Sequence, residues 1–361
     1  MKQSISAVLF SFFIATNFAS SAMCESALRA CARNSFSDNA MVFSGNATKD
    51  LAQKIADYLQ VELGQAIVSK FNDGEIQIQV KETVRGKHIF IVQSTCPTAT
   101  QSVNDTLMEL FLLVRTMKRA SAASITVVIP YYGYARQDRK AMARVPISAA
   151  DVAMMLEEAG VDRVLTIDLH CGQIQGFFRN APVDNLYSSP IFIDYFVSKG
   201  LDNVVVVSPD AGGVERANKF MQQLRKAGVP AEIALISKRR ASAGVIESMD
   251  LIGNVVNEYG EGANAIIVDD MCDTGGTLVK AAQLLKDSGA KRVYAIMPHG
   301  IFSGNALDKI GNSVIYEMVT ADTIPLRGQA PANLTCLSVS ALLGDAILRI
   351  YHGDSVSALF E

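Results

Sequence analysis

The sequence has 361 residues, enough for two α/β domains of about 150 residues each and a further extension. Hydrophobic residues make up 49% and charged residues 19% of the chain, as in a well-packed soluble protein, and the net charge of -3 excludes a general attraction to nucleic acid or to an anionic membrane surface. The six cysteines show neither Cys-x-x-Cys pairing nor zinc-ligand spacing, so we expect free thiols in a reducing compartment.

The first 40 residues differ in composition from the rest of the chain. Lys2 precedes an apolar run at 7–15, and small residues follow at 19–22. This order is typical of a secretory signal, and the run is too short to span a membrane. A leader for an organelle and an upstream start codon are the alternatives. We place residues 1–40 outside the fold, and we expect no membrane association, because no later segment is apolar enough over a sufficient length.

The next part of the chain alternates helical and β-like patterns. Within it lies Phe71-Asn72-Asp73-Gly74-Glu75, where Asp-Gly predicts a hairpin turn. The expected elements are a helix at 49–60, β-like runs at 65–69, 75–80 and 88–92, a helix at 103–119 and a buried strand at 125–130.

A basic segment follows that buried strand. Three tyrosines in 131–134 lead into Arg136-Gln137-Asp138-Arg139-Lys140. A solvated surface loop is one interpretation. Phosphate binding is the other interpretation, because the planar guanidinium group of arginine can donate to two phosphate oxygens at once, whereas the single ammonium group of lysine does not match this geometry.

Another buried strand, at 163–167, ends in Asp168-Leu169-His170. Residues two apart on an extended chain point to the same side, so Asp168 and His170 are expected to share a divalent ion. A lone histidine is more often structural than a ligand.

A strand–acid–glycine–helix unit comes next, with a strand at 203–208 and Asp210 before Gly212 and Gly213. A β-like run then leads to Lys238-Arg239-Arg240, and the small residues 241–244 follow. Three consecutive cations are usually a solvated run. On a flexible loop they can instead form a lid that brings positive charge to a bound substrate.

The most informative stretch is 265–277. A buried strand at 265–268 precedes Asp269 and Asp270, and Thr274-Gly275-Gly276-Thr277 then opens a helix. A plain βα turn is one interpretation. The other is a ligand site, because the glycines, threonine hydroxyls and helix N-terminus suit a phosphate, whereas the carboxylates suit sugar hydroxyls or a magnesium shell. Together these features describe the two ends of a ribose 5-phosphate.

Val268-Asp269-Asp270-Met271-Cys272-Asp273-Thr274-Gly275-Gly276-Thr277 resembles the ribose-phosphate motif of the phosphoribosyltransferase superfamily, and in particular that of the ribose-phosphate diphosphokinases. The resemblance extends over 41–361 and includes five motifs in the family's order. It implies an α/β fold of two tandem phosphoribosyltransferase-like domains, 41–187 and 188–361, each a mainly parallel sheet flanked by helices. It also implies transfer of the β,γ-diphosphoryl group of Mg-ATP to the C1 hydroxyl of ribose 5-phosphate, giving phosphoribosyl diphosphate and AMP.

The resemblance assigns roles residue by residue. ATP is expected at Phe71, Asp73, Glu75, Arg136, Gln137 and His170. Magnesium is expected at His170 and Asp210, with Asp168 added from its position at the strand end. Catalysis is assigned to Lys238 and Arg240. Ribose 5-phosphate is expected at Arg240, Asp269, Asp270, Asp273, Thr274, Gly275, Gly276 and Thr277.

The chain departs from the family pattern in places. Arg179-Asn180-Ala181 replaces a segment that usually carries an aspartate, and no proline follows Arg240. His299 is expected to be a packing or site-edge residue rather than a base, and no protein base is obvious.

The resemblance also implies regulation and assembly. Inorganic phosphate is expected as an activator, and the family implies a homo-hexamer in the cytoplasm whose ATP site takes Phe71–Glu75 from a neighbouring subunit. A regulatory nucleotide site is expected at Arg85, Arg144, Ser355 and Ser357, with weakened inhibition because Met142 and Ala143 replace a basic residue and a serine. Met41 matches the family's own N-terminus, which favours the upstream start codon. A phosphoribosyltransferase and a non-catalytic regulatory homologue remain the alternative functions.

Overall fold

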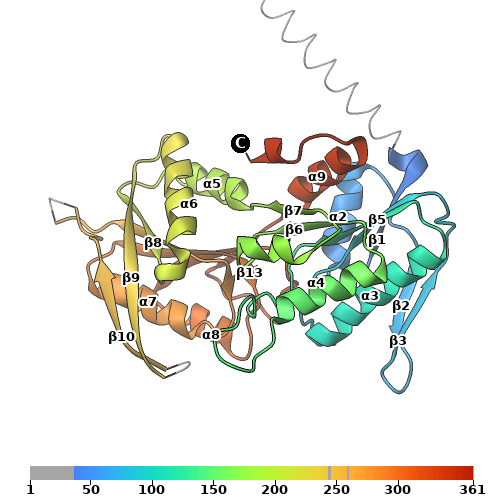
Figure 1. The fold of residues 1–361 in the computed structure, drawn as a ribbon. Helices are drawn as coiled ribbons and strands as arrows, with labels where there is room; N and C mark the ends of the chain where they lie inside the picture. Colours follow the sequence, from blue (N-terminus) through green and yellow to red (C-terminus); the bar gives the residue numbers. More distant parts are fainter. Residues whose placement is uncertain (1–35, 243–244, 258–259, 361) are drawn as a thin grey trace, which may run out of the picture.

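The structure is a computed structural model that describes residues 36–242, 245–257 and 260–360 (Figure 1). Its framework is two mainly parallel sheets, one from each half of the chain, with helices packed around them. In Figure 1 the N-terminal sheet lies on the right and the C-terminal sheet on the left. The predicted fold class is confirmed.

The N-terminal sheet is parallel throughout. Its elements are β1 Ala40–Ser44, α2 Lys49–Leu59, β4 His88–Val92, α3 Val103–Arg119, β5 Ser124–Ile129, α4 Ser148–Ala159, β6 Arg163–Ile167 and β7 Val183–Leu186. The strand order is β1-β4-β5-β6-β7. Neighbouring residues on one strand enter different cores, because Phe90 packs with α2 whereas Ile89 and Ile91 pack with α3 and α4. Burial on both faces explains why these strands are continuous apolar runs.

A β-hairpin stands beside this sheet. It consists of β2 Ala66–Lys70 and β3 Ile76–Val80, paired antiparallel, and β3 lies against α3. Its turn is closed by the Phe71 N–H, which donates to the Glu75 carbonyl at 2.8 Å, and by Gly74 with a φ of 95°. The predicted Asp-Gly turn is confirmed, since glycine adopts this left-handed backbone without strain.

The C-terminal sheet is larger and has one antiparallel edge. Its elements are α5 Ser189–Ser198, β8 Val204–Ser208, α6 Val214–Lys226, β9 Ala231–Ser242, β10 Val245–Ile252, β11 Asn264–Val268, β12 Met271–Cys272, α7 Gly276–Asp287, β13 Arg292–Gly300, α8 Ala306–Gly311, β14 Ile315–Ala321, β15 Leu334–Leu337 and α9 Ser340–His352. The strand order is β10-β9-β8-β11-β13-β14-β15, and the short β12 pairs with the end of β13. Within the described part of this sheet, β9 and β10 pair antiparallel and the other neighbouring strands pair parallel.

One apolar core joins the two halves. Leu51 and Ile55 of α2 share it with Leu343 and Ile347 of α9, and Figure 1 shows α9 beside α2. At this contact the Tyr58 hydroxyl donates to an Asp345 oxygen at 2.8 Å. The last long helix of the chain is therefore part of the packing of the N-terminal sheet.

The structure corrects the expected start of the fold. Phe36 lies within the segment placed outside the fold, but its side chain is completely buried between Phe90 and Tyr351, with ring centroids 5.7 and 5.2 Å away. The fold therefore includes residues from Phe36 onward. The predicted leader at 7–22 lies outside the described residues.

The mobile loop expected after Lys238-Arg239-Arg240 is also corrected. The three cations lie on β9, which pairs with β10 up to Ser242 opposite Val245, with register shifts near Ile246. Backbone pairing holds the segment as a long hairpin because β10 supplies a partner strand that composition alone does not reveal; residues 243–244 lie outside the described part. Among the described residues, no helix is sufficiently long and apolar to cross a membrane.

Candidate active site

The carboxyl ends of strands from both sheets meet between the two halves of the chain. His170, just after β6, places Nδ1 2.6 Å from Oδ2 of Asp270, just after β11. Arg136, after β5, donates from Nη1 to Oδ2 of Asp273 at 2.7 Å. Residues predicted for ATP are thus brought directly to residues predicted for ribose 5-phosphate. Such an edge is where open α/β sheets bind ligands.

Two adjacent carboxylates form the centre of the site. Burial and the neighbouring Asp270 charge raise the pKa of Asp269 to about 7. Burial acts on Asp270 too, but the hydrogen bond from His170 and the charge of Arg216 outweigh it and hold the pKa of Asp270 below its usual range. The same hydrogen bond raises the pKa of His170. Because a carboxylate only accepts, His170 donates from Nδ1 and its Nε2 is left for another partner.

The predicted phosphate loop has the expected backbone geometry. Gly275 is the N-cap of α7 with a φ of 71°, and the helix begins at Gly276 without a side-chain cap. The first N–H groups of a twelve-residue helix therefore face the loop. Lys309 donates to the Thr274 carbonyl at 3.2 Å, and Thr277 lies in the first helical turn. One detail was not expected, namely the two-residue strand β12 between Asp270 and the loop.

Asp273 begins this loop and already has a cationic partner. Its side chain is 28% exposed and that of Arg136 is 53% exposed. Burial raises the pKa of Asp273, but contacts with Ser303 and Arg136 outweigh it and leave the pKa below its ordinary value. The pair thus joins the two halves of the chain without being buried.

The second acid–glycine loop is organised by Asp210. Its Oδ1 accepts from the Gly212 and Gly213 N–H groups at 3.0 and 3.2 Å, and its Oδ2 accepts from Lys238 Nζ at 3.2 Å. The Lys238 side chain is only 7% exposed. The predicted metal ligand and the predicted catalytic lysine are therefore paired. The Arg240 side chain lies outside the described residues.

The geometry predicted for Asp168 is wrong. β6 ends at Ile167, and Asp168 has a φ of 44°, so the chain is not extended there. Its Oδ2 accepts from the Ser188 N–H at 3.0 Å and from the Ser188 hydroxyl. The extended-chain argument for pairing Asp168 with His170 therefore does not hold, and the Asp168 carboxylate is bound by Ser188.

His299 holds this bend from the other half of the chain. It is 2% exposed; its Nε2 lies 3.1 Å from the Asp168 carbonyl and its Nδ1 lies 2.9 Å from the Thr323 hydroxyl. Burial lowers the pKa of His299, which favours the neutral ring. A carbonyl only accepts, so Nε2 carries the proton, while the Thr323 hydroxyl near Nδ1 also lies 3.0 Å from the Pro298 carbonyl, to which it donates. These contacts agree with a packing role rather than that of a base.

Arg216 was missed by sequence reasoning. It lies in the first turns of α6 and places Nη1 3.3 Å from Asp269 Oδ1 and 3.6 Å from Asp270 Oδ1. The segment Val214-Glu215-Arg216 has no distinctive pattern. The one available signal was its position within one helical turn of an acid–glycine loop.

Several predicted residues are not brought to this centre. Phe71, Asp73 and Glu75 lie at the exposed hairpin turn, which projects away from the space between the sheets (Figure 1). Gln137 accepts from the Ser148 hydroxyl at 2.5 Å, at the start of α4. The regulatory candidates Arg85, Arg144, Ser355 and Ser357 are all exposed. In Figure 1 the C-terminal turn and the loop before α4 lie on opposite sides of the molecule.

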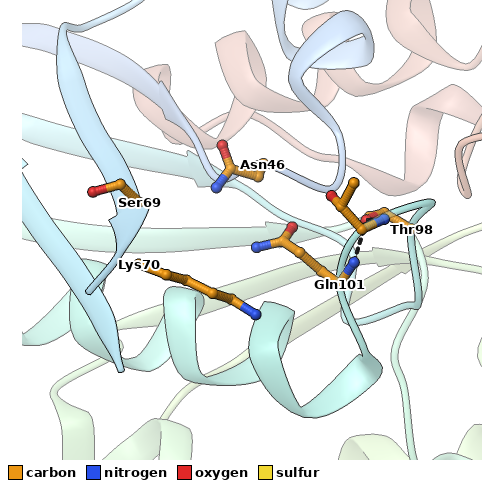
Figure 2. A pocket seen from close by; sticks show the side chains of 6 residues that line it. Asn46, Ser69, Lys70, Thr98 and Gln101 are labelled. Carbon is orange, nitrogen blue, oxygen red and sulfur yellow. Dashed lines mark hydrogen bonds between the residues drawn. The ribbon is translucent and has the colours of Figure 1, made fainter. Parts of the chain in front are cut away.

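A separate cavity of about 420 Å³ lies between β2 and the start of α3 (Figure 2). Below it the buried Glu109 accepts from the side-chain amides of Asn46, at 2.6 Å, and Gln101. Lys70 at its rim is paired with Asp105 at 2.9 Å. None of the predicted site residues lines this cavity. The lining consists of Asn46, Ser69, Lys70, Thr98, Thr100 and Gln101.

The donor set of the site suits magnesium shared with a phosphorylated substrate. Among the described residues, no three His, Cys, Asp or Glu side chains converge on one ion position. Magnesium often binds one or two carboxylates and completes its shell with water and substrate phosphates. Asp210 and the Nε2 of His170 are the residues that would contribute to such a partial shell, and the Asp270 contact would orient the imidazole as a second shell does.

Comparison with known proteins agrees with this geometry. A family model described as the N-terminal domain of ribose phosphate pyrophosphokinase matches residues 40–160, and one described as the phosphoribosyl synthetase-associated domain matches residues 245–361. The chain is 53% identical over 324 residues to the ribose-phosphate pyrophosphokinase of Vibrio parahaemolyticus, covering 89% of this chain and 98% of the relative. It is 52% identical to that of Ralstonia nicotianae over 90% of this chain and 99% of the relative.

A solved structure gives the same result. The phosphoribosylpyrophosphate synthetase of Mycobacterium smegmatis superposes with a TM-score of 0.79 at 37% identity, covering 87% of this chain and 99% of that one. The fold and the interdomain site thus define an α/β enzyme built from phosphoribosyltransferase-like domains. Within that class, the chain belongs to the ribose-phosphate pyrophosphokinase family.

Proposed function

We propose that the enzyme transfers the β,γ-diphosphoryl group of Mg-ATP to the C1 hydroxyl of ribose 5-phosphate, forming 5-phosphoribosyl 1-diphosphate and AMP for nucleotide biosynthesis. The observation that carries this proposal is the direct contact across the domains between His170 and Asp270, at 2.6 Å. It supports a site in which the nucleotide and the sugar phosphate bind close enough together for a single in-line transfer. Family membership supports the same reaction.

Each part of the site has a role in this proposal. The backbone N–H groups and hydroxyls at Thr274–Thr277 bind the 5-phosphate, and Asp269 and Asp270 accept from the ribose hydroxyls. This fixes the C1 oxygen in line with the β-phosphorus, so that much of the rate arises from positioning. Lys238 and Arg240 neutralise the charge of the transferring group. His170 and Asp210 hold magnesium, which when bound reduces the negative charge of the phosphates.

The proposal is tested by identifying the nucleotide products of the reaction. The protein is incubated with ATP, ribose 5-phosphate, magnesium and inorganic phosphate, and nucleotides are separated by chromatography. We expect AMP only when the sugar phosphate is present. Lys238→Ala should lower the rate by more than 100-fold, about 3 kcal/mol of barrier, whereas the exposed Lys226→Ala on α6 serves as the control. ADP as product would mean an ordinary kinase, and no turnover despite nucleotide binding would favour the non-catalytic homologue.

We also propose a homo-hexamer in which a neighbour's Phe71, Asp73 and Glu75 complete the ATP site. The 51% exposure of Phe71 at a projecting turn supports this arrangement. Mixing inactive Phe71→Ala and Lys238→Ala proteins tests it, because a shared site allows some mixed subunits to regain activity. No recovery after subunit exchange would refute the shared site.

Regulation follows the same family pattern in this proposal. Inorganic phosphate activates, the enzyme acts in the cytoplasm, and a nucleotide inhibits weakly through Arg85, Arg144, Ser355 and Ser357. Steady-state rates with added ADP, with and without phosphate, test the regulatory part. Strong inhibition that survives Arg144→Ala would refute the assignment.

A further inference from the structure

Arg216 occupies a position between the two acid loops of the site. It lies three residues after Gly213, where the Asp210 loop ends, and its guanidinium reaches across to the Asp269–Asp270 pair. The side chain is 29% exposed, so it lies at the wall of the site rather than in the core. It therefore connects the Asp210 loop with the sugar side of the proposed site.

The contacts of Arg216 fix the orientation of both carboxylates. Asp269 Oδ1 accepts from Arg216 and, at 2.9 Å, from the Asp270 N–H. Asp270 is held from two directions, with Oδ1 toward Arg216 and Oδ2 on His170. Both contacts of Asp269 are thus made through Oδ1, and its carboxyl group also interacts with that of Asp270.

Two adjacent, largely buried carboxylates repel each other unless a cation compensates them. Arg216 supplies that cation, because its Nη1 lies 3.3 Å from one oxygen of Asp269 and 3.6 Å from one oxygen of Asp270, so that a single nitrogen holds the two carboxylates side by side. A pair of this kind suits the vicinal 2- and 3-hydroxyls of a ribose better than a single hydroxyl.

We infer that Arg216 is a positioning residue for the sugar, which aligns Asp269 and Asp270 to accept from the vicinal diol and so sets the preference for ribose 5-phosphate over its 2-deoxy analogue. This inference rests on the proposed function. It assigns Arg216 to the sugar side, although the residue belongs to the helix that follows the Asp210 loop. A role in holding ATP phosphates is the competing interpretation, and the two give different kinetic results.

The experiment compares Arg216→Gln with Lys219→Gln. Lys219 is on the same helix and forms an exposed ion pair with Glu215, so its substitution removes the same charge without touching the site. Initial AMP formation is measured while ATP, ribose 5-phosphate and 2-deoxyribose 5-phosphate are varied in turn. For Arg216→Gln we expect a 10- to 100-fold higher KM for ribose 5-phosphate, a KM for ATP within 3-fold of wild type, and a ribose-to-deoxyribose ratio of kcat/KM reduced at least 10-fold. Lys219→Gln should leave all three unchanged.

Other outcomes overturn the inference. A raised KM for ATP with an unchanged sugar KM would place Arg216 on the phosphates. An equal loss with both sugars would show a merely structural role. If Arg216→Gln does not fold, Arg216→Lys carries the test, since its single ammonium keeps the charge and should show an intermediate KM and intermediate sugar preference. Failure of wild-type enzyme to form AMP would instead refute the proposed function.

Discussion

Removal of the ion pair between Arg136 and Asp273 should weaken ATP binding strongly and lower the stability of the fold only slightly. Arg136→Met removes the guanidinium and keeps a side chain of similar length and apolar stem. The pair lies across the two domains at 2.7 Å, so a purely structural view would give it a large share of the domain contact. The solvent exposure of both side chains instead predicts a small contribution to stability.

The expected stability loss is small. With side chains 53% and 28% exposed, the pair is screened by water, and exposed ion pairs typically contribute about 0–1 kcal/mol. For a chain of this size that corresponds to a fall in Tm of about 3 °C or less. Lys118→Met is the matched control, because Lys118 forms an exposed pair with Asp162 at 3.3 Å away from the site.

The expected loss in nucleotide binding is much larger. Hydrogen bonds to charged groups contribute about 1.5–3 kcal/mol, which corresponds to an increase of about 10- to 150-fold in the KM for ATP. Calorimetric unfolding and AMP-release kinetics on the same preparations measure both quantities. A fall in Tm above 8 °C, or an ATP KM within 2-fold of wild type, would refute this reasoning.

Three further predictions concern the interface between the domains. His299→Leu leaves the Asp168 carbonyl without its buried donor and should lower the free energy of unfolding by about 1–3 kcal/mol, whereas His299→Gln, which retains a donor, should lose less; equal losses in urea titrations would contradict the hydrogen-bond assignment. In Gly344→Ala the new Cβ would lie 2.4 Å from a ring carbon of Tyr58, and overpacking of this kind costs about 1–3 kcal/mol; the loss should shrink in a Tyr58→Ala background, and an undiminished loss would refute the clash. The raised pKa of His170 means that its pairing with Asp270 stabilises the metal-free protein fully below the ordinary histidine pKa of about 6.5 and is lost as pH rises through the higher folded value. Urea midpoints in EDTA should therefore differ more between pH 6 and 8.5 for wild type than for His170→Asn, and parallel pH profiles would count against the pair.

The sequence predicted the parts of the site that are local in the chain. A buried strand, acidic residues, glycines and a helix start occur consecutively around Asp270 and Gly275, and the structure has that order with the left-handed φ at Gly275. The strand ends and the Asp-Gly hairpin were predictable for the same reason, because they too depend on residues that are close together in the sequence. Parallel sheets then bring separate strand ends to one edge without further information.

Features that depend on distant partners could not be predicted. Arg216 is defined by a contact 53 residues away with Asp269, and its helix shows only an ordinary amphipathic pattern. The bend at Asp168 depends on Ser188 and His299, so strand alternation failed there. The cations of β9 appeared to enter a mobile loop because their partner strand β10 lacks a strong apolar pattern. Phe36 was assigned to the extension because its partner Tyr351 is near the other end of the chain.

The packing of α9 on α2 has a consequence for how the chain is made. The Tyr58–Asp345 contact joins residues 287 positions apart, and at about 5–20 residues per second a ribosome needs about 15 to 60 s to synthesise that interval. During this time α9 is absent from the apolar face of α2, although the last strand of its sheet, β7, is complete by Leu186. The N-terminal half thus emerges first but is completed last, and its nascent chain is a natural client for chaperones that shield apolar surface.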